Sequence, residues 1–125
     1  MSERLALAAQ DPWAEQFVRL GELVMSSERD GDMHAISVNG EMDVANAGDV
    51  EQELSWVEAS DARVILMDLS GLTFMDCTAM RLLSSAGERA RARGEHGRLL
   101  VLRPPQHVYH ALRTAGVAEL LSFAD

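Results

Sequence analysis

Residues 64–83 read VILMDLSGLTFMDCTAMRLL and form the most informative stretch of the chain. The apolar run at 64–67 predicts a buried strand, residues 70–71 (Ser-Gly) predict a turn, and residues 72–75 predict a short extended piece. The polar corner at residues 76–78, Asp-Cys-Thr, then opens a helix pattern. A helix N-terminus has unpaired backbone N–H groups and a dipole that favours added negative charge. We therefore expect this corner to suit a phosphorylation switch, and its unusual feature is the thiol.

The composition is that of one small globular domain. The chain has 125 residues, enough to bury a real core, and 47% of them are hydrophobic. Its 20 acidic residues outnumber the 11 basic ones, which gives a net charge of −9. That balance argues against nucleic-acid or anionic-membrane binding and favours a protein partner with a basic patch. The single cysteine excludes an intrachain disulfide.

The N-terminal sequence carries no pattern for export or membrane insertion, so we expect a cytoplasmic protein. Residues 12–20 predict a short amphipathic helix that ends at Gly21. Its apolar face carries Trp13, Phe17 and Leu20. We expect that face to dock on the domain's own sheet or on a second copy of the chain, which would give a homodimer.

The rest of the chain alternates strand and helix patterns. Residues 23–27 and 34–38 predict a β-hairpin. Helices are predicted over residues 43–59, 78–93 and 105–115, strands over residues 64–69 and 99–102, and residues 120–123 close the domain. This order predicts an α/β fold with parallel strands joined by right-handed crossovers and with the hairpin as an antiparallel edge.

The central stretch resembles the signature of STAS domains, the family of anti-sigma factor antagonists. In that family an apolar strand leads to a corner that typically reads Asp-Ser-Ser/Thr-Gly-Leu. Residues 39–43, Asn-Gly-Glu-Met-Asp, are similar to the family's Gly-Glu-Leu-Asp, and residues 102–105 and 115–117 resemble parts of its last strand and helix. The resemblance extends over residues 23–123.

The resemblance implies a fold and a domain boundary. The expected fold is the SpoIIAA-like STAS fold, an open mixed β-sheet with helices packed mainly on one side. The STAS domain is expected over residues 23–125, and residues 1–22 are left as an N-terminal extension.

The resemblance also implies roles at the corner. Cys77 stands where the family usually carries a phosphorylated serine, Asp76 matches the acidic residue before it, and Thr78 takes the next, hydroxylated position. In the family, an anti-sigma factor that is also a serine/threonine kinase phosphorylates that serine, and the antagonist then lets go. Because a thiol is not a normal substrate of such a kinase, we expect the usual switch to be lost. Relocation of the phosphate to Thr78 is the alternative.

Further residues complete the expected partner surface. Ala79 and Met80 stand where the family usually has Gly and Leu, and Asp43 matches an Asp near the switch corner. The simpler interpretation of Asp43 is that it caps the following helix. The partner is expected to bind through Asp43, Asp76, Cys77, Thr78 and the first helical turn with Ala79 and Met80.

These features favour a binding module rather than an enzyme. The resemblance implies that it binds a kinase-type anti-sigma factor, a histidine-kinase-like ATPase, and releases a sigma factor by partner switching without touching DNA. An accessory or scaffold subunit of a larger assembly, such as a transport complex, is the alternative.

Cys77 itself has three other interpretations. It could be a redox sensor, the nucleophile of an enzyme, or merely a small half-buried residue. For the enzyme interpretation, the sequence shows no residue at a recognisable spacing from Cys77 that would act as its general base. His107 and His110 could share a metal but lack an apparent third ligand, and no cofactor motif is present.

Overall fold

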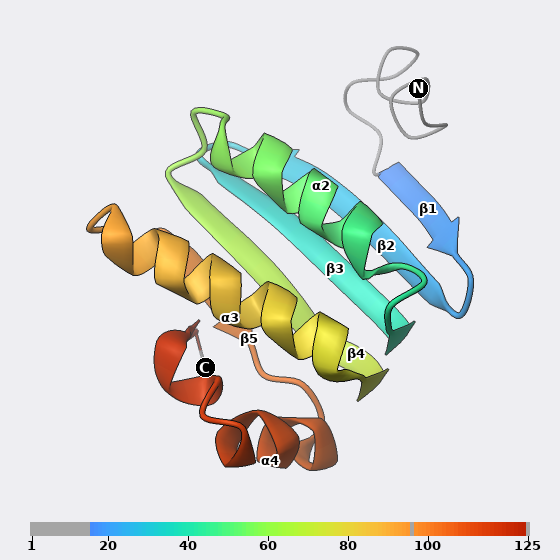
Figure 1. Ribbon diagram of the computed structural model, residues 1–125. Helices are drawn as coiled ribbons and strands as arrows, with labels where there is room; N and C mark the ends of the chain where they lie inside the picture. Colours follow the sequence, from blue (N-terminus) through green and yellow to red (C-terminus); the bar gives the residue numbers. More distant parts are fainter. Residues whose placement is uncertain (1–15, 96, 125) are drawn as a thin grey trace.

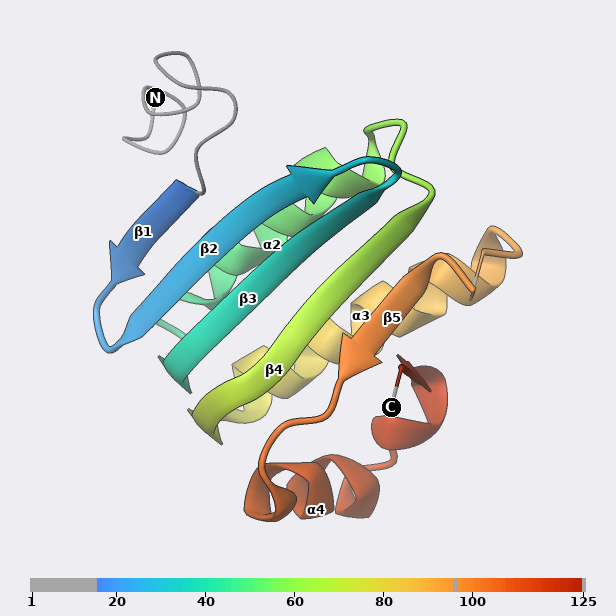
Figure 2. The ribbon, with the colours of Figure 1, turned by 180° about the vertical axis from the view of Figure 1, so that it is seen from behind.

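The computed structural model describes residues 16–95 and 97–124, which form one six-stranded sheet in the order β1-β2-β3-β4-β5-β6. Helices α2 and α3 lie side by side on one face of the sheet (Figure 1). Seen from behind, no helix of the described ranges crosses the opposite face (Figure 2). The strands are β1 (Gln16–Leu20), β2 (Leu23–Asp30), β3 (Met33–Met42), β4 (Val64–Met75), β5 (Leu99–Leu102) and β6 (Ser122–Phe123). The helices are α2 (Ala47–Glu58), α3 (Cys77–Ala92), α4 (Gln106–Thr114) and the 3₁₀ turn η1 (Ala118–Leu120).

Strand pairing follows the predicted scheme except at the antiparallel edge, where β1 and not the predicted hairpin is the outermost strand. Strands β1, β2 and β3 pair antiparallel, and β3, β4, β5 and β6 pair parallel. The parallel steps require crossovers, which α2 and α3 supply on the same face of the sheet. The predicted hairpin over residues 23–27 and 34–38 is confirmed, although its strands are longer than expected.

The core lies between the sheet and the helices α2 and α3. On β3 the alternate residues Ile36 and Val38 are fully buried, as a period of two requires on a sheet with one covered face. The apolar stripe of α2, which consists of Val50, Leu54 and Val57, is buried against them. Burial of each such side chain contributes about 1.5–3 kcal/mol, so this layer supplies the main stabilisation of the fold.

The predicted N-terminal helix is wrong over residues 16–20, which form the edge strand β1. The backbone of β1 pairs with β2 from Phe17 opposite Ser26 to Leu20 opposite Leu23. Gly21 does not end a helix but provides the positive φ of 67° in the two-residue turn of this hairpin. An isolated helix of this length is only marginally stable in water. Pairing with β2 instead gives the backbone of residues 16–20 hydrogen-bond partners in the sheet. Residues 12–15 of the predicted helix lie outside the described residues.

The predicted turn at residues 70–71 is also wrong, because β4 runs through it to Met75. The turn signal reflects a local contact in which Asp68 accepts hydrogen bonds from the backbone N–H and the hydroxyl of Ser70. Gly71 serves a close approach instead, since a Cβ there would lie 1.7 Å from Oδ1 of Asn39 on β3. The register of β3 and β4 shifts at this point.

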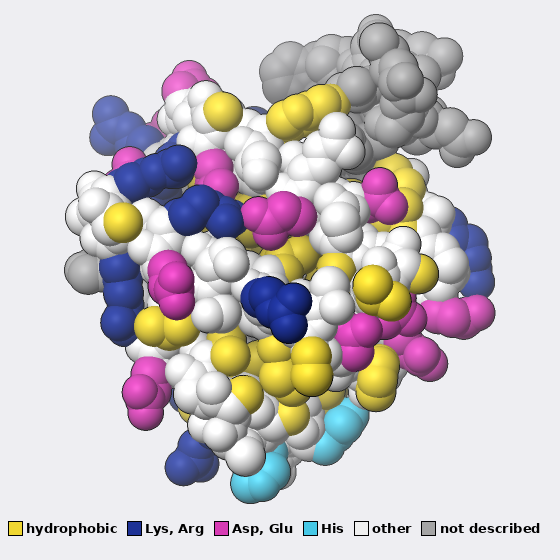
Figure 3. All heavy atoms as spheres, viewed as in Figure 1, with side chains coloured by type: hydrophobic (Ala, Val, Ile, Leu, Met, Phe, Trp, Pro, Cys, Tyr) yellow, Lys and Arg dark blue, Asp and Glu magenta, His cyan; other side chains and the backbone are white. Residues whose placement is uncertain are grey.

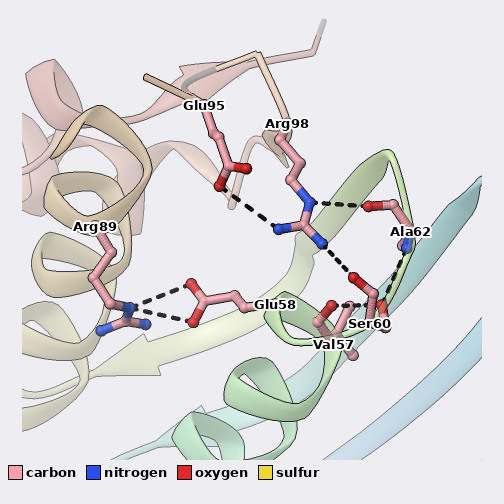
Figure 4. Close-up of polar contacts among 7 residues, drawn as sticks. All are labelled: Val57, Glu58, Ser60, Ala62, Arg89, Glu95 and Arg98. Carbon is pink, nitrogen blue, oxygen red and sulfur yellow. Dashed lines mark hydrogen bonds and ion pairs between the residues drawn. The ribbon is translucent and has the colours of Figure 1, made fainter. Parts of the chain in front are cut away.

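The N-terminal ends of β4 and β5 are held by arginine side chains (Figure 4). Arg98 donates from Nε to the carbonyl of Ala62 at 2.9 Å and from Nη2 to the carbonyl of Ser60 at 3.0 Å. Nearby, Arg89 on α3 donates from Nε to both carboxylate oxygens of Glu58 on α2, at 3.2 and 3.3 Å. We call this region, defined by Arg89, Arg98 and these partners, the arginine end.

Candidate functional site

The candidate site forms at the opposite end of the sheet, where β3 and β4 finish side by side. Met42 pairs with Met75, and the backbone N–H of Asp76 donates to the Met42 carbonyl at 3.2 Å. Because both strands run in the same direction, the loop after β3 and the corner after β4 leave the sheet at one edge. The two sequence motifs therefore meet, and we call this region the corner end.

Asp76 joins the two motifs through its carboxylate. It is the N-cap of α3, and its Oδ1 accepts from the backbone N–H of Ala79 at 2.9 Å. Its Oδ2 accepts from the backbone N–H of Val44, in the loop after β3, at 2.9 Å. Asp76 therefore holds the loop against the start of α3, and its role within the chain is to position the surface around it.

Asp43 does not cap α2, so the simpler interpretation of this residue is wrong. The N-cap of α2 is Asn46, three residues later. Oδ1 of Asp43 instead accepts from the backbone N–H of Ala45 at 3.0 Å, which is a local Asx turn. Asp43 is half-buried at the corner end. It directly precedes Val44, whose backbone N–H donates to the Asp76 carboxylate.

Asn46 organises the loop and was missed by the sequence reasoning. Its side chain is 2% exposed, and its Oδ1 accepts from the backbone N–H of Asp43 at 2.9 Å. Its Nδ2 donates to the carbonyls of Leu20 and Glu41 at 3.1 and 3.0 Å. One amide thus connects the loop to β1 and β3. An Asn before a helix pattern signals a cap, but these distant partners have no local signal in the sequence.

The first turn of α3 divides the predicted site residues between surface and core. Cys77, the first residue of the helix, is exposed, so its interpretation as a half-buried residue is wrong. Thr78 and Met80 are half-buried, and Met80 packs against the core. Ala79 is 0% exposed. Its methyl group supports the turn from beneath, which leaves Cys77 and Thr78 as the side chains on the outside.

Apolar side chains stand beside the acidic ones at this end. Val44 is 73% exposed and Phe74, near the end of β4, is 48% exposed. Figure 3 shows acidic and apolar side chains next to one another over the region where β3 and β4 end. Exposed apolar groups bordered by polar residues are typical of contact surfaces. We call Asp43, Val44, Cys77 and Thr78 the corner patch.

A shallow groove of about 250 Å³ runs from Thr78 between α2 and α3. Arg81, three residues after Thr78 and therefore on the same side of the helix, lines this groove. Arg89 lies further along it and forms ion pairs with Glu51 at 3.1 Å and Glu58 at 3.2 Å. Thr78 and the cationic side chain of Arg81 therefore line the same groove.

Away from this site, Ser27 on β2 and His34 on β3 lie near Glu53 on α2. Ser27 Oγ and His34 Nε2 are 2.5 Å apart. Burial lowers the pKa of His34, the nearby Glu53 carboxylate partly opposes that effect, and Arg29 reinforces it. Ser27 is 3% exposed and Glu53 is 4% exposed, so no substrate in solution can reach this serine. These residues belong to the core rather than to a catalytic site.

The two histidines that were candidates for a shared metal, His107 and His110, have different surroundings. His107 Nε2 donates to the carbonyl of Thr73 at 2.8 Å, which ties α4 to β4, while His110 lines a different cavity. Across residues 16–95 and 97–124, no group of three or more His, Cys, Asp or Glu is arranged to hold a metal ion. Over the same ranges, no helix has the length and apolar character needed to cross a bilayer.

Comparison with known proteins identifies the family and the fold. The profile of the STAS domain matches residues 25–125. An anti-sigma factor antagonist from Mycobacterium paratuberculosis superposes with a TM-score of 0.61 at 18% identity, over 81% of this chain and 84% of that one. The unphosphorylated anti-sigma factor antagonist SpoIIAA gives 0.61 at 18% identity, over 90% and 89%. RsbS from Moorella thermoacetica gives 0.60 at 14% identity, over 80% and 85%.

These similarities confirm the predicted SpoIIAA-like fold. At such low sequence identities, structural similarity establishes the fold and not the function. No relative is found among curated protein sequences.

Proposed function

Since the chain belongs to the STAS domain family, we propose that it is an anti-sigma factor antagonist. In this proposal it binds an anti-sigma factor of the serine/threonine kinase type through the corner patch. Binding displaces a sigma factor, and the chain itself touches no DNA and catalyses no reaction. The likeness to SpoIIAA and to the Mycobacterium paratuberculosis antagonist supports this role.

The observation that carries the proposal is the exposed position of Cys77 at the start of α3. It follows a half-buried Asp76 that is engaged on both oxygens, and it stands next to a loop with the 73%-exposed Val44. The protein contacts of Asp76 fix the shape of this surface, and Cys77, Thr78 and Val44 supply what a partner touches.

The thiol makes the regulation of this surface different from that of SpoIIAA, whose structure is known in unphosphorylated and phosphorylated forms. A phosphate adds close to two negative charges and would disrupt a packed interface. Without a hydroxyl at residue 77, a kinase partner has no acceptor there. The chain then stays competent for binding when the kinase is active. The alternative is that Thr78 is the phosphate acceptor. In its favour, the cationic side chain of Arg81 lines the same groove as Thr78.

Calorimetry with the histidine-kinase-like anti-sigma factor encoded by the same host tests the proposal. The variant Val44→Ser removes an exposed apolar contact at little cost to the fold, and we expect it to weaken binding by about tenfold. Phe17→Ser is the matched control, because Phe17 is also exposed, at 56%, but lies on β1.

Equal affinities of the two variants would place the interface elsewhere. Absence of any binding, together with recovery of transporter subunits in a pull-down from the host, would replace the proposal by the scaffold function.

A further inference from the structure

We propose that a second copy of this chain pairs with β1 across a two-fold axis and so joins the sheets of two protomers edge to edge. Strand β1 lies at the edge of the sheet, and among residues 16–95 and 97–124 its neighbour is β2 (Figure 2). Its sequence is QFVRL, and the side chain of Phe17 is 56% exposed. The backbone donors and acceptors of an edge strand can bind a further strand.

Alternate residues of β1 direct their backbone groups away from β2. Leu20 and Leu23 flank the two-residue turn of the hairpin, so they form a hydrogen-bonded pair, and Val18 repeats this arrangement two residues earlier. The N–H and C=O groups of the intervening residues, Phe17 and Arg19, therefore point away from β2. These four groups are the ones that a second strand would bind.

The side chains of Phe17 and Arg19 lie on the face of the sheet that α2 and α3 leave uncovered. Leu20 packs against the core on the helical face, and Val18 lies opposite the buried Met25 on that same face. Because side chains alternate along a strand, Phe17 and Arg19 share the other face, and both are exposed. The strand thus presents an aromatic ring and a cation two residues apart.

Antiparallel pairing of two copies brings these unlike side chains together. One register lets the outward backbone groups meet in hydrogen-bonded pairs, with Phe17 opposite the partner's Arg19 and Arg19 opposite the partner's Phe17. Val18 then faces Val18 of the partner subunit on the two-fold axis. A guanidinium group beside an aromatic ring is attractive, and an isologous interface makes the contact twice.

The charge of Arg19 selects this register over its neighbours. A shift in one direction sets the two arginines opposite each other, and like charges in that position are destabilising. A shift in the other direction sets Phe17 opposite the partner's Phe17 and separates both arginines from the rings. The favoured register is therefore the one in which the strand complements itself.

This self-complementarity is the reason for choosing a second copy as the occupant of the edge. The same strand supplies the ring and the cation on both sides, so one sequence meets both requirements. The segment that precedes β1 in the chain is a weaker candidate, because Pro12 removes one backbone donor from it.

The pairing leaves the corner patch of each protomer accessible. Strand β1 ends at the corner end, where Nδ2 of Asn46 donates to the Leu20 carbonyl at 3.1 Å. Because the two β1 strands would run antiparallel, the corner ends of the two protomers point in opposite directions. The dimer therefore presents one corner patch at each end, and the inference does not depend on which partner binds there.

Cross-linking of single-cysteine proteins tests the register. In a Cys77→Ala background, Val18→Cys places two thiols directly opposite each other in a non-hydrogen-bonded pair, with Cα atoms about 4.5 Å apart and within reach of a disulfide. Phe17→Cys is the matched control, because the two cysteines would be diagonal neighbours about 7–8 Å apart. With copper phenanthroline as the oxidant, we expect Val18→Cys to form covalent dimer at least about tenfold faster than Phe17→Cys.

Sedimentation equilibrium of the unchanged chain measures the association itself. We expect a dissociation constant on the order of 10 μM, because one pair of short strands forms a smaller contact than a standard interface of about 1,600 Å². Arg19→Pro should raise this constant at least about tenfold, since proline removes an outward N–H and keeps the inward bonds of β1 to β2. Circular dichroism checks that the variant is folded.

A chain that stays monomeric at about 1 mM, or a folded Arg19→Pro protein with an unchanged dissociation constant, would overturn the interface. Faster cross-linking of Phe17→Cys than of Val18→Cys would overturn the register. Dimerisation that appears only after deletion of residues 1–15 would assign the edge to the chain's own N-terminal segment and overturn the choice of a second copy.

Discussion

The two ends of the sheet are stabilised in opposite ways. At the arginine end, Arg98 donates to two backbone carbonyls and Arg89 pairs with Glu51 and Glu58, so charge is neutralised within the protein. At the corner end, the side chains of Asp76 and Asn46 instead bind backbone groups of the neighbouring segments. Acidic and apolar side chains there remain on the surface. The first end contributes ion pairs and hydrogen bonds to stability, and the second combines a hydrogen-bonded frame with the surface that we propose as the partner site.

The first test of this contrast concerns Asn46, whose side chain holds the loop at the corner end. Asn46→Ala should lower the free energy of unfolding by about 3 kcal/mol, because it leaves three partly buried backbone groups without their partner. Urea denaturation monitored by circular dichroism measures the change. Gln52→Ala is the control at an exposed amide side chain on α2 and should change the stability by less than about 0.5 kcal/mol. Similar midpoints for the two variants would show that Asn46 does not organise the loop.

The arginine end provides the converse test. Arg98→Ala should lower the free energy of unfolding by about 2 kcal/mol, since it removes two hydrogen bonds from a side chain that is only 17% exposed. Affinity for the anti-sigma factor should stay within about twofold of the unchanged protein, because the interface that we propose lies at the far end of the sheet. A large loss of affinity in a still-folded Arg98→Ala protein would contradict the division of roles between the ends.

Charge at the corner patch should matter more than the thiol itself. Thr78→Glu should weaken partner binding by about tenfold or more, because it brings a carboxylate into the contact surface. Thr78→Gln controls for size, and Cys77→Ala should have a smaller effect than Thr78→Glu. Calorimetry that gives one affinity for all three variants would remove residues 77 and 78 from the interface.

The smallest expected effect concerns pH and His34. Burial lowers the pKa of this residue from its ordinary value of 6.5, so the folded protein prefers the neutral imidazole. Below about pH 6.5 the unfolded chain takes up a proton before the folded chain does. The contribution to stability is therefore fully present above pH 6.5 and is lost as the pH falls towards the lowered pKa.

His34→Gln isolates this contribution. The variant should lose less stability than the unchanged protein when urea midpoints at pH 7.0 and pH 5.5 are compared. An identical loss in both proteins would assign the pH dependence to carboxylates elsewhere.

Much of the fold could be predicted from local patterns. The strand at residues 99–102 was predicted with its observed bounds, because an apolar run between Gly and Pro residues has few other interpretations. The start of α3 was predicted to within one residue, because a polar corner directly precedes a helix pattern. Residues 16–20 were not, because one face of apolar side chains fits both a short helix and a paired edge strand, and only the distant β2 decides between them.

The candidate site was predictable in part. The motif resemblance singled out Asp43 and Asp76, and the structure brings their segments together through Val44 and Met42. Asn46 was missed because its partners Leu20 and Glu41 are unremarkable in the sequence and meet it only after the sheet has formed. The exposure of Cys77 also required the structure, because a residue at the first helical position can face either way.

The central claim is that Cys77 leaves the corner patch without the usual phosphorylation switch. The most direct test incubates the protein with its kinase-type anti-sigma factor and Mg-ATP and maps phosphate by mass spectrometry. The claim predicts no phosphate on the unchanged protein and phosphorylation at residue 77 in Cys77→Ser, which also shows that the kinase is active. Stoichiometric phosphate on Thr78 of the unchanged protein would contradict it.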